Sequence, residues 1–202
     1  MKNSLTFWIS IGSTYTYLTA LRLNNILKDN DLDIRVKIIN IRWIMKKMDN
    51  IPFPLTKPSK VNYMWEDIKR RAKIYQIPIP KVPAPYPLKN FDEANLCALV
   101  ALQEGWFIQY LETTYRNWFL DGIPAGSKEN IELTCSKNNV DYQLFKERSS
   151  KNEFLKLYEE NTQVAYQFGI FGVPSFSVNE NLFWGDDRLN DIIHFKEELN
   201  LV

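Results

Sequence analysis

A proline inside an apolar run near the C-terminus restricts the fold of this chain more than any other residue. Pro174 lies in the segment GVPSF at 172–176. Because proline has no amide hydrogen, it fits only the start of a strand, an edge strand or a special turn. We predict that the Val173-Pro174 bond is cis, which would leave the backbone groups of Val173 free to pair with an extended ligand. The alternative is a proline that only begins an edge strand.

The N-terminal part supplies a segment that could face this loop. Residues 5–11 are typical of a strand, and residues 15–23 have the apolar spacing of a helix. In a thioredoxin-type site a Cys-x-x-Cys would occupy positions 13–16, but these positions are Ser-Thr-Tyr-Thr, so dithiol exchange cannot occur there. The hydroxyl of Ser13 and the positive end of the helix could stabilise a ligand thiolate. Ser13 could instead be only an N-cap.

The rest of the pattern predicts an α/β fold. Residues 33–39 should form a strand parallel to the first, and residues 41–60, with three prolines, should be irregular. A hairpin is expected from residues 175–178 and 182–184. A capping box, Ser150–Glu153, should open the helix at 150–169, and Asp186 or Asp187 should cap the helix at 188–199. The other helices are expected at 62–74, 91–104, 106–120, 129–137 and 142–148.

This order of elements predicts two domains. A thioredoxin-like domain would consist of residues 1–40 and 160–202. An all-helical insertion domain, residues 41–159, would lie between its βαβ and αββα halves.

Composition excludes several classes of function. The 202 residues carry a net charge of +1, which gives no indication of nucleic-acid binding. No apolar run reaches membrane-spanning length and no signal-peptide core is present, so we expect no membrane association. Cys97 and Cys135 are expected to be free thiols in a reducing cytoplasm. With His194 as the single histidine, expected to be structural, we predict no metal site.

Three motifs together resemble a known family. The segment FWISIGSTYTYL at 7–18 is similar to the opening of 2-hydroxychromene-2-carboxylate isomerases and kappa-class glutathione transferases. DNIP at 49–52, followed by Lys60, Tyr63, Asp67 and Arg71, resembles their insertion domain. GIFGVP at 169–174 and FWGDDRL at 183–189 resemble their closing motif. The resemblance implies a DsbA-like thioredoxin fold, glutathione as cofactor, a small hydrophobic or aromatic substrate, and a homodimer.

The chain also departs from the family pattern at three positions. The family usually has proline where this chain has Thr14, and often an acid where it has Ser10. An amide or small hydroxyl usually precedes the motif aspartate, whereas Asp186 stands here and would repel a ligand carboxylate unless it points away. These departures concern the shape of the substrate pocket and part of the glutathione contact.

The resemblance also assigns the site residues. Ser13 would be catalytic and lie against the glutathione sulfur, Val173 beside Pro174 would pair with the cysteinyl backbone, and Asp187 suits the ammonium of the γ-glutamyl group. The glutathione-binding residues implied are Ser13, Thr14, Tyr15, Asn50, Val173, Pro174, Trp184, Gly185, Asp186 and Asp187. Asn50, Trp43 and Tyr86 would contact substrate, with a turn asparagine and core aromatics as the alternatives.

The predicted function is that of a glutathione-dependent isomerase. Its substrate would be aromatic and conjugated, like 2-hydroxychromene-2-carboxylate, and Ser13 would stabilise the glutathione thiolate. A kappa-class-like transferase that conjugates small electrophiles is the alternative. Two further classes are a thiol–disulfide oxidoreductase, against which Ser13 and Thr16 argue, and a non-catalytic thioredoxin-fold binding protein.

Overall fold

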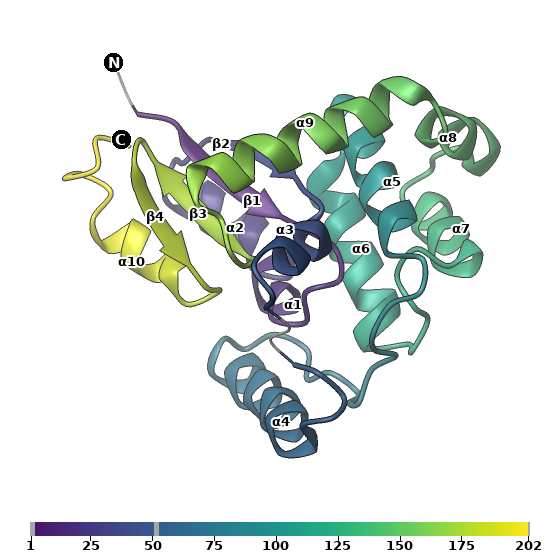
Figure 1. Ribbon diagram of the computed structural model, residues 1–202, viewed down its shortest axis with the longest axis horizontal. Helices are drawn as coiled ribbons and strands as arrows, with labels where there is room; N and C mark the ends of the chain where they lie inside the picture. The colour runs from purple at the N-terminus through teal and green to yellow at the C-terminus, as the bar shows by residue number, and fades with distance from the viewer. Residues whose placement is uncertain (1–2, 51–52, 202) are drawn as a thin grey trace.

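The two ends of the chain pair in one four-stranded mixed sheet (Figure 1). The computed structural model describes residues 3–50 and 53–201. Strand β1 (Leu5–Ile9) is parallel to β2 (Ile34–Ile38) and antiparallel to β3 (Ser175–Val178). Strand β3 also pairs with β4 (Asn181–Trp184), which gives the order β2-β1-β3-β4. The predicted parallel pair and the predicted hairpin are therefore confirmed.

Helices connect the strands, and most of them lie between β2 and β3 along the chain. Helices α1 (Thr16–Ala20) and α2 (Leu23–Asp29) link β1 to β2, and α10 (Arg188–His194) follows β4. Between β2 and β3 the chain forms α3 (Ile41–Lys47), α4 (Pro58–Ile74), α5 (Phe91–Gln103), α6 (Phe107–Phe119), α7 (Lys128–Lys137), α8 (Tyr142–Ser149) and α9 (Asn152–Phe168).

Helix α9 joins the helical group to the sheet. In Figure 1 it runs from α8 across to the strands, while α4 lies at the lower edge, apart from α5 to α8. The helix is continuous from Asn152 to Phe168, so residue 159, the boundary expected between the two domains, falls inside it. No helix in the described ranges is long and apolar enough to cross a membrane.

The segment after β2 is helical, which corrects the expectation that residues 41–60 are irregular. Helix α3 begins after Asn40, whose side chain accepts a hydrogen bond from the Trp43 amide and so caps the helix. Helix α4 begins at Pro58 rather than at residue 62. Proline is tolerated at the first helical position because the amide of that residue has no partner inside the helix.

Two predicted caps are wrong. The Ser150 hydroxyl donates to the carbonyl of Lys146, at the end of α8, and Lys151 occupies the N-cap position of α9 without a side-chain bond. Asp187 occupies the N-cap position of α10, but its carboxylate also makes no capping bond. The last helix ends at His194 rather than at residue 199. Ser150 bonds instead to a backbone carbonyl of the preceding helix, and Asp187 bonds to the side chain of Arg188.

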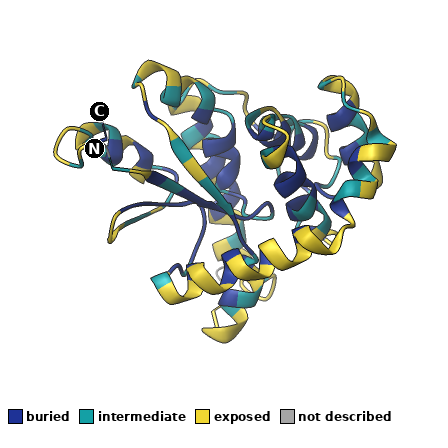
Figure 2. Ribbon diagram, turned by 90° about the horizontal axis from the view of Figure 1, so that it is seen from above, coloured by how far each residue is buried: buried dark blue, intermediate teal, exposed yellow. Residues whose placement is uncertain are grey.

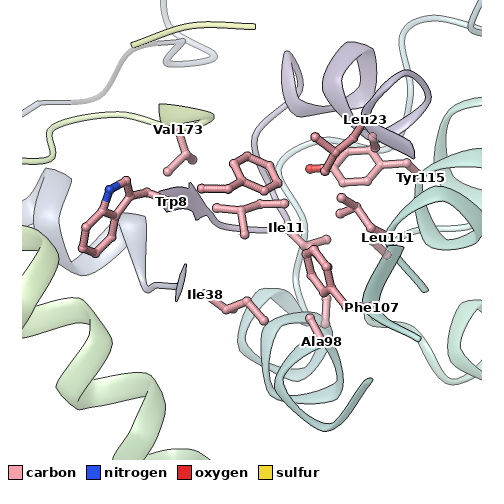
Figure 3. Packing of buried hydrophobic residues seen from close by; sticks show 14 of the residues in the cluster. Trp8, Ile11, Leu23, Ile38, Ala98, Phe107, Leu111, Tyr115 and Val173 are labelled. Carbon is pink, nitrogen blue, oxygen red and sulfur yellow. The ribbon is translucent and has the colours of Figure 1, made fainter. Parts of the chain in front are cut away.

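One hydrophobic core joins the sheet to the helices. Buried residues lie on the strands and on the inward faces of the helices (Figure 2). In the close-up, Ile11 lies between Val173 on the sheet side and Phe107 and Leu111 of α6 (Figure 3). Ile11 is fully buried, so the segment that leads from β1 to Ser13 is anchored in the core.

Asn95 of α5 fixes the backbone of that segment. Its side-chain oxygen accepts from the Ile11 amide at 2.8 Å, and its side-chain nitrogen donates to the carbonyls of Ile11 at 3.0 Å and Phe91 at 2.8 Å. Asn95 is fully buried, so water cannot replace these bonds. The inserted helices therefore hold the chain two residues before Ser13.

Replacing Asn95 with alanine should destabilise the whole protein. Asn95→Ala leaves the buried amide and carbonyl of Ile11 without partners, so we expect the free energy of unfolding in urea to fall by about 2–4 kcal/mol. Gln167→Ala, at an exposed position of α9, is the control and should change stability by less than about 0.5 kcal/mol. Equal stability of the two variants would contradict the proposed role of Asn95.

Candidate active site

A cavity of about 970 Å³ lies where the N-terminal loop, α3, α4 and the C-terminal loops meet. Most residues that the sequence assigned to the glutathione and substrate sites line this cavity, although they come from distant parts of the chain. They are Ser13, Thr14, Tyr15, Asn50, Tyr86, Val173, Pro174, Trp184, Gly185, Asp186 and Asp187.

Ser13 contacts the loop that contains Pro174. The Val173-Pro174 bond is cis, and the Ser13 hydroxyl donates to the Val173 carbonyl at 2.9 Å. Ser13 is not an N-cap, because α1 begins at Thr16 with Tyr15 at the N-cap position. Since α1 has only five residues, its positive end is weaker than expected for a full helix, and the hydroxyl is the main polar group offered here.

Tyr115 of α6 fixes the backbone of Ser13. Its hydroxyl donates to the Ser13 carbonyl at 2.9 Å. Burial raises the pKa of Tyr115, so the hydroxyl remains protonated and can serve only as a donor to this carbonyl at neutral pH. The side chain of Ser13 can thus rotate while its backbone stays in place.

Residues 183–187 fold onto the loop that contains Pro174. The Gly185 amide donates to the Pro174 carbonyl at 3.0 Å. Trp184 lies against Gly172, where an added Cβ would stand 2.4 Å from the indole nitrogen, and its ring meets Phe171 edge-on at 4.8 Å between centroids. Any side chain at position 172 would therefore displace Trp184 from the wall of the cavity.

Asp186 points away from the cavity mouth, into the protein. One carboxylate oxygen accepts from the Thr19 hydroxyl at 3.1 Å and pairs with the Arg22 guanidinium at 2.8 Å. The other oxygen has no hydrogen-bond partner among the described residues. Burial raises the pKa of Asp186, although Arg22 and Thr19 oppose this effect. Arg22 offsets the charge of this carboxylate, which reduces the repulsion of a ligand carboxylate that the sequence suggested.

Asp187 behaves differently from its neighbour. Its carboxylate is bonded to Arg188 at 2.5 Å and lies 3.8 Å from Arg71 of α4. Partial burial would raise the pKa of Asp187, but the bond and charge of Arg188, with the charge of Arg71, lower it overall. Asp187 is therefore a carboxylate at neutral pH and can receive an ammonium group.

One face of α4 completes the site. The Thr14 hydroxyl donates to the Met64 sulfur at 2.9 Å, and the Tyr15 hydroxyl donates to Asp67 at 3.0 Å. Arg71 follows one turn later beside Asp187. The spacing of 64, 67 and 71 places these side chains on one helical face. Asp67 and Arg71 belong to the motif quoted from the sequence, and their spacing of four residues is consistent with a shared helical face.

Trp43 does not line the cavity, so its expected place in the substrate pocket is corrected. Its ring packs edge-on against Tyr166 of α9, at 5.6 Å between centroids. The reason is the unpredicted helix α3, which turns Arg42 and Met45 toward the cavity and Trp43 away from it. Asn50 lies at the exposed rim just after α3, and the half-buried Tyr86 donates to the Phe53 carbonyl at 3.4 Å.

The cavity wall combines cations with apolar surface. Four positively charged residues line it that the sequence motifs did not assign to the site: Arg42, Lys46, Lys60 and Arg71. The apolar surface includes Met45, Phe53, Phe91 and Phe171. No cluster of metal-binding side chains occurs within the described part of the chain. The arrangement suits an anionic ligand that also carries an apolar group.

Comparison with known proteins defines the class. Residues 4–195 match the family model of the DSBA-like thioredoxin domain, and the chain belongs to this family. It is 27% identical over 184 residues to 2-hydroxychromene-2-carboxylate isomerase of Pseudomonas putida, covering 91% of this chain and 89% of that protein. It is 24% identical over 202 residues to glutathione S-transferase kappa 1 of Caenorhabditis elegans, covering 91% and 86%. Both relatives are named as enzymes.

Solved structures show the same fold. A 2-hydroxychromene-2-carboxylate isomerase structure aligns with a TM-score of 0.85 and 24% identity over 97% of this chain and 95% of that one. The cytosolic disulfide reductase DsbM from Pseudomonas aeruginosa, solved with GSH, aligns with a TM-score of 0.65 and 15% identity over 96% and 98%. The predicted α/β fold of thioredoxin type with inserted helices is confirmed.

The raised pKa of Asp186 predicts a pH-dependent stability. A carboxyl whose pKa is higher in the folded than in the unfolded state (about 3.9 for aspartate) stabilises most below the unfolded pKa. This contribution is lost as the pH rises through the folded pKa. The free energy of unfolding of the wild type, minus that of Asp186→Asn, should therefore decrease as the pH rises from about 3.5 toward neutrality. Glu129→Gln, at an exposed position, is the control, and a constant difference for Asp186→Asn would contradict the pKa shift.

Proposed function

We propose that this protein is a glutathione-dependent isomerase whose substrate is an aromatic conjugated compound of the 2-hydroxychromene-2-carboxylate type. One observation carries the proposal: the Ser13 hydroxyl, the Val173 backbone and the Asp187 carboxylate line the same cavity. The names of the relatives support it, since they include 2-hydroxychromene-2-carboxylate isomerases, a kappa glutathione transferase and a disulfide reductase solved with GSH. The cytoplasmic location and the homodimer expected from the sequence belong to the same proposal.

The residues present fit glutathione as a ligand. Within the described ranges the Val173 amide donates no backbone hydrogen bond, and its carbonyl accepts only from a side chain that can rotate. An extended cysteinyl residue could therefore pair with both groups. Asp187 offers a carboxylate for the γ-glutamyl ammonium, and the cations of the cavity wall offer partners for the carboxylates of the peptide.

Ser13 has two alternative partners in this arrangement. Its hydroxyl now donates to the Val173 carbonyl, the same group that a ligand amide would use. Once a ligand amide donates to Val173, the hydroxyl is released and can donate to a sulfur that lies beside it. A donor bond favours the thiolate over the thiol and so lowers the pKa of the thiol. Bound glutathione would supply this thiolate as a nucleophile toward a conjugated carbonyl compound.

The remaining walls would hold the substrate. Met45, Phe53 and Phe91 offer apolar surface for a planar ring, and Arg42 lies with its guanidinium carbon 4.2 Å from the centre of the Phe91 ring. Asn50, at the rim, can donate to a substrate carbonyl. A cationic and apolar wall suits a substrate that carries both a carboxylate and an aromatic ring.

A kappa-class-like transferase is the second candidate, favoured by the similarity to glutathione S-transferase kappa 1. It would use the same thiolate site, and the two activities differ in whether glutathione is regenerated or leaves in the product. Disulfide exchange does not fit, because both cysteines are buried and burial raises the pKa of their thiols, to about 12 for Cys135. A non-catalytic binding protein would bind glutathione without turnover of either kind.

Glutathione should stabilise the folded protein. A ligand that binds only the native state adds about 2.7 kcal/mol at a concentration one hundred times its Kd. We therefore expect the melting temperature to rise with millimolar glutathione in a thermal-shift measurement. The rise should be smaller for Asp187→Asn, which lacks the charge offered to the ammonium. An unchanged melting temperature of the wild type would refute the proposed cofactor.

The hydroxyl of Ser13 should act on the thiolate more than on binding. A hydrogen bond to a charged group contributes about 1.5–3 kcal/mol, so Ser13→Ala should lower turnover by roughly 10- to 100-fold. Glutathione affinity should stay within about tenfold. The pKa of the bound thiol, followed by thiolate absorbance against pH, should rise.

Two further variants control this test. Ser136→Ala, at an exposed position of α7, should leave turnover and the thiol pKa unchanged. Treated with oxidised glutathione, Ser13→Cys should exchange into a mixed disulfide and release one molecule of glutathione, detectable by mass spectrometry, if the sulfur lies against position 13. Full activity of Ser13→Ala with an unmoved thiol pKa would mean that the hydroxyl only ties Ser13 to Val173.

A further inference from the structure

Arg71 contributes a cation to the cavity wall. Its side chain is 33% exposed, and within the described ranges it donates no hydrogen bond. Its one carboxylate contact, to Asp187 at 3.8 Å, is longer than a hydrogen bond. By contrast, Arg42 donates to the Leu88 carbonyl at 2.8 Å, and Arg188 donates to both Asp187 and Asp191. The planar guanidinium of Arg71 therefore has unused donors at the cavity.

The surroundings hold Arg71 in position without neutralising it. Its guanidinium carbon lies 5.2 Å from the centre of the Tyr75 ring, one helical turn further along α4. The same ring contacts Arg22, whose charge is already paired with Asp186. Asp187 is shared with Arg188. Arg71 thus lacks a carboxylate of its own, and a bound anion would supply one.

The chemistry of the γ-glutamyl group matches the pair formed by Asp187 and Arg71. This group carries an ammonium and a carboxylate on one carbon atom, so the two charges must be bound side by side. Asp187 suits the ammonium, and Arg71 is the neighbouring cation. Guanidinium groups bind carboxylates through two parallel hydrogen bonds. The N-terminal amides of α10 are a weaker partner for this carboxylate, because the helix has only seven residues.

We propose that Arg71 binds the α-carboxylate of the γ-glutamyl group and determines the specificity of the site for γ-glutamyl thiols. The inference rests on the proposed use of glutathione and adds to it the residue that recognises one end of the peptide. It also gives the Asp67–Arg71 motif of α4 two functions. Asp67 accepts a hydrogen bond from Tyr15, two residues after Ser13, and Arg71 binds the ligand carboxylate.

Three thiols separate the two charges of the γ-glutamyl group. Glutathione carries both charges. 4-Aminobutyryl-cysteinylglycine lacks the α-carboxylate but keeps the ammonium, and glutaryl-cysteinylglycine lacks the ammonium but keeps the carboxylate. Their affinities would be measured by titration calorimetry for the wild type, Arg71→Met, Arg71→Lys and Lys73→Met. Lys73 is exposed on the same helix and does not line the cavity, so Lys73→Met removes one charge from α4 as a matched control.

The wild type should bind 4-aminobutyryl-cysteinylglycine about 10- to 100-fold more weakly than glutathione, as expected for the loss of a charge-assisted pair. Arg71→Met should weaken glutathione and glutaryl-cysteinylglycine by the same factor. It should leave 4-aminobutyryl-cysteinylglycine within about threefold, because that ligand has no carboxylate for Arg71 to bind. Arg71→Lys should lie between, and Lys73→Met should resemble the wild type.

Several outcomes would overturn the inference. If Arg71→Met weakens all three thiols equally, Arg71 only shapes the site. If the wild type binds glutathione and 4-aminobutyryl-cysteinylglycine equally well, Arg71 does not bind the α-carboxylate, while the proposed use of glutathione stands. If the wild type binds none of the thiols, both proposals fail. The comparison of ligands on the wild type requires no variant to fold, and circular dichroism would check each variant.

Discussion

The antiparallel pairing of β1 with β3 is the contact on which the site depends. Trp8, near the end of β1, stands opposite Ser175 at the start of β3, so the segment that leaves β1 and the segment that enters β3 meet at one edge of the sheet. Phe7 stacks on Phe176 at 4.9 Å between ring centroids, and the Trp8 indole donates to the Ser177 hydroxyl at 2.9 Å. This register brings Ser13 to Val173.

The inserted helices turn that meeting point into an ordered cavity. Asn95 and Tyr115, both buried, hold the backbone of Ile11 and Ser13. Helix α4 contacts Tyr15, close to Ser13, through Asp67, and it approaches Asp187 through Arg71. The thioredoxin-type domain supplies the loops that carry Ser13 and Val173. The inserted helices α5 and α6 hold the backbone of the first loop, and α4 forms one wall of the cavity.

The Asp186-Asp187 pair shows how environment separates two identical residues. Burial raises the pKa of Asp186, whereas at Asp187 the effect of partial burial is outweighed by Arg188 and Arg71, which lower the pKa of that carboxyl. The first carboxylate joins the closing motif to Thr19 and Arg22 inside the protein, and the second remains charged at the cavity. A departure from the family pattern at position 186 is accommodated by a partner 164 residues away in the chain.

The sequence alone determined the strands, the hairpin, most helices and the motifs around Ser13, Pro174 and Asp187, because period-two and helical spacings record which face of an element is buried. It did not reveal α3, whose cap at Asn40 is local but whose pattern was masked by the prolines that follow, and so it misplaced Trp43. Only the tertiary structure decided that Asp186 pairs with Arg22 and that Arg71 stands beside Asp187. The physical reason is that local periodicity tells which side chains are buried, whereas the partner of a hydroxyl, carboxylate or guanidinium is chosen by contacts across the whole fold.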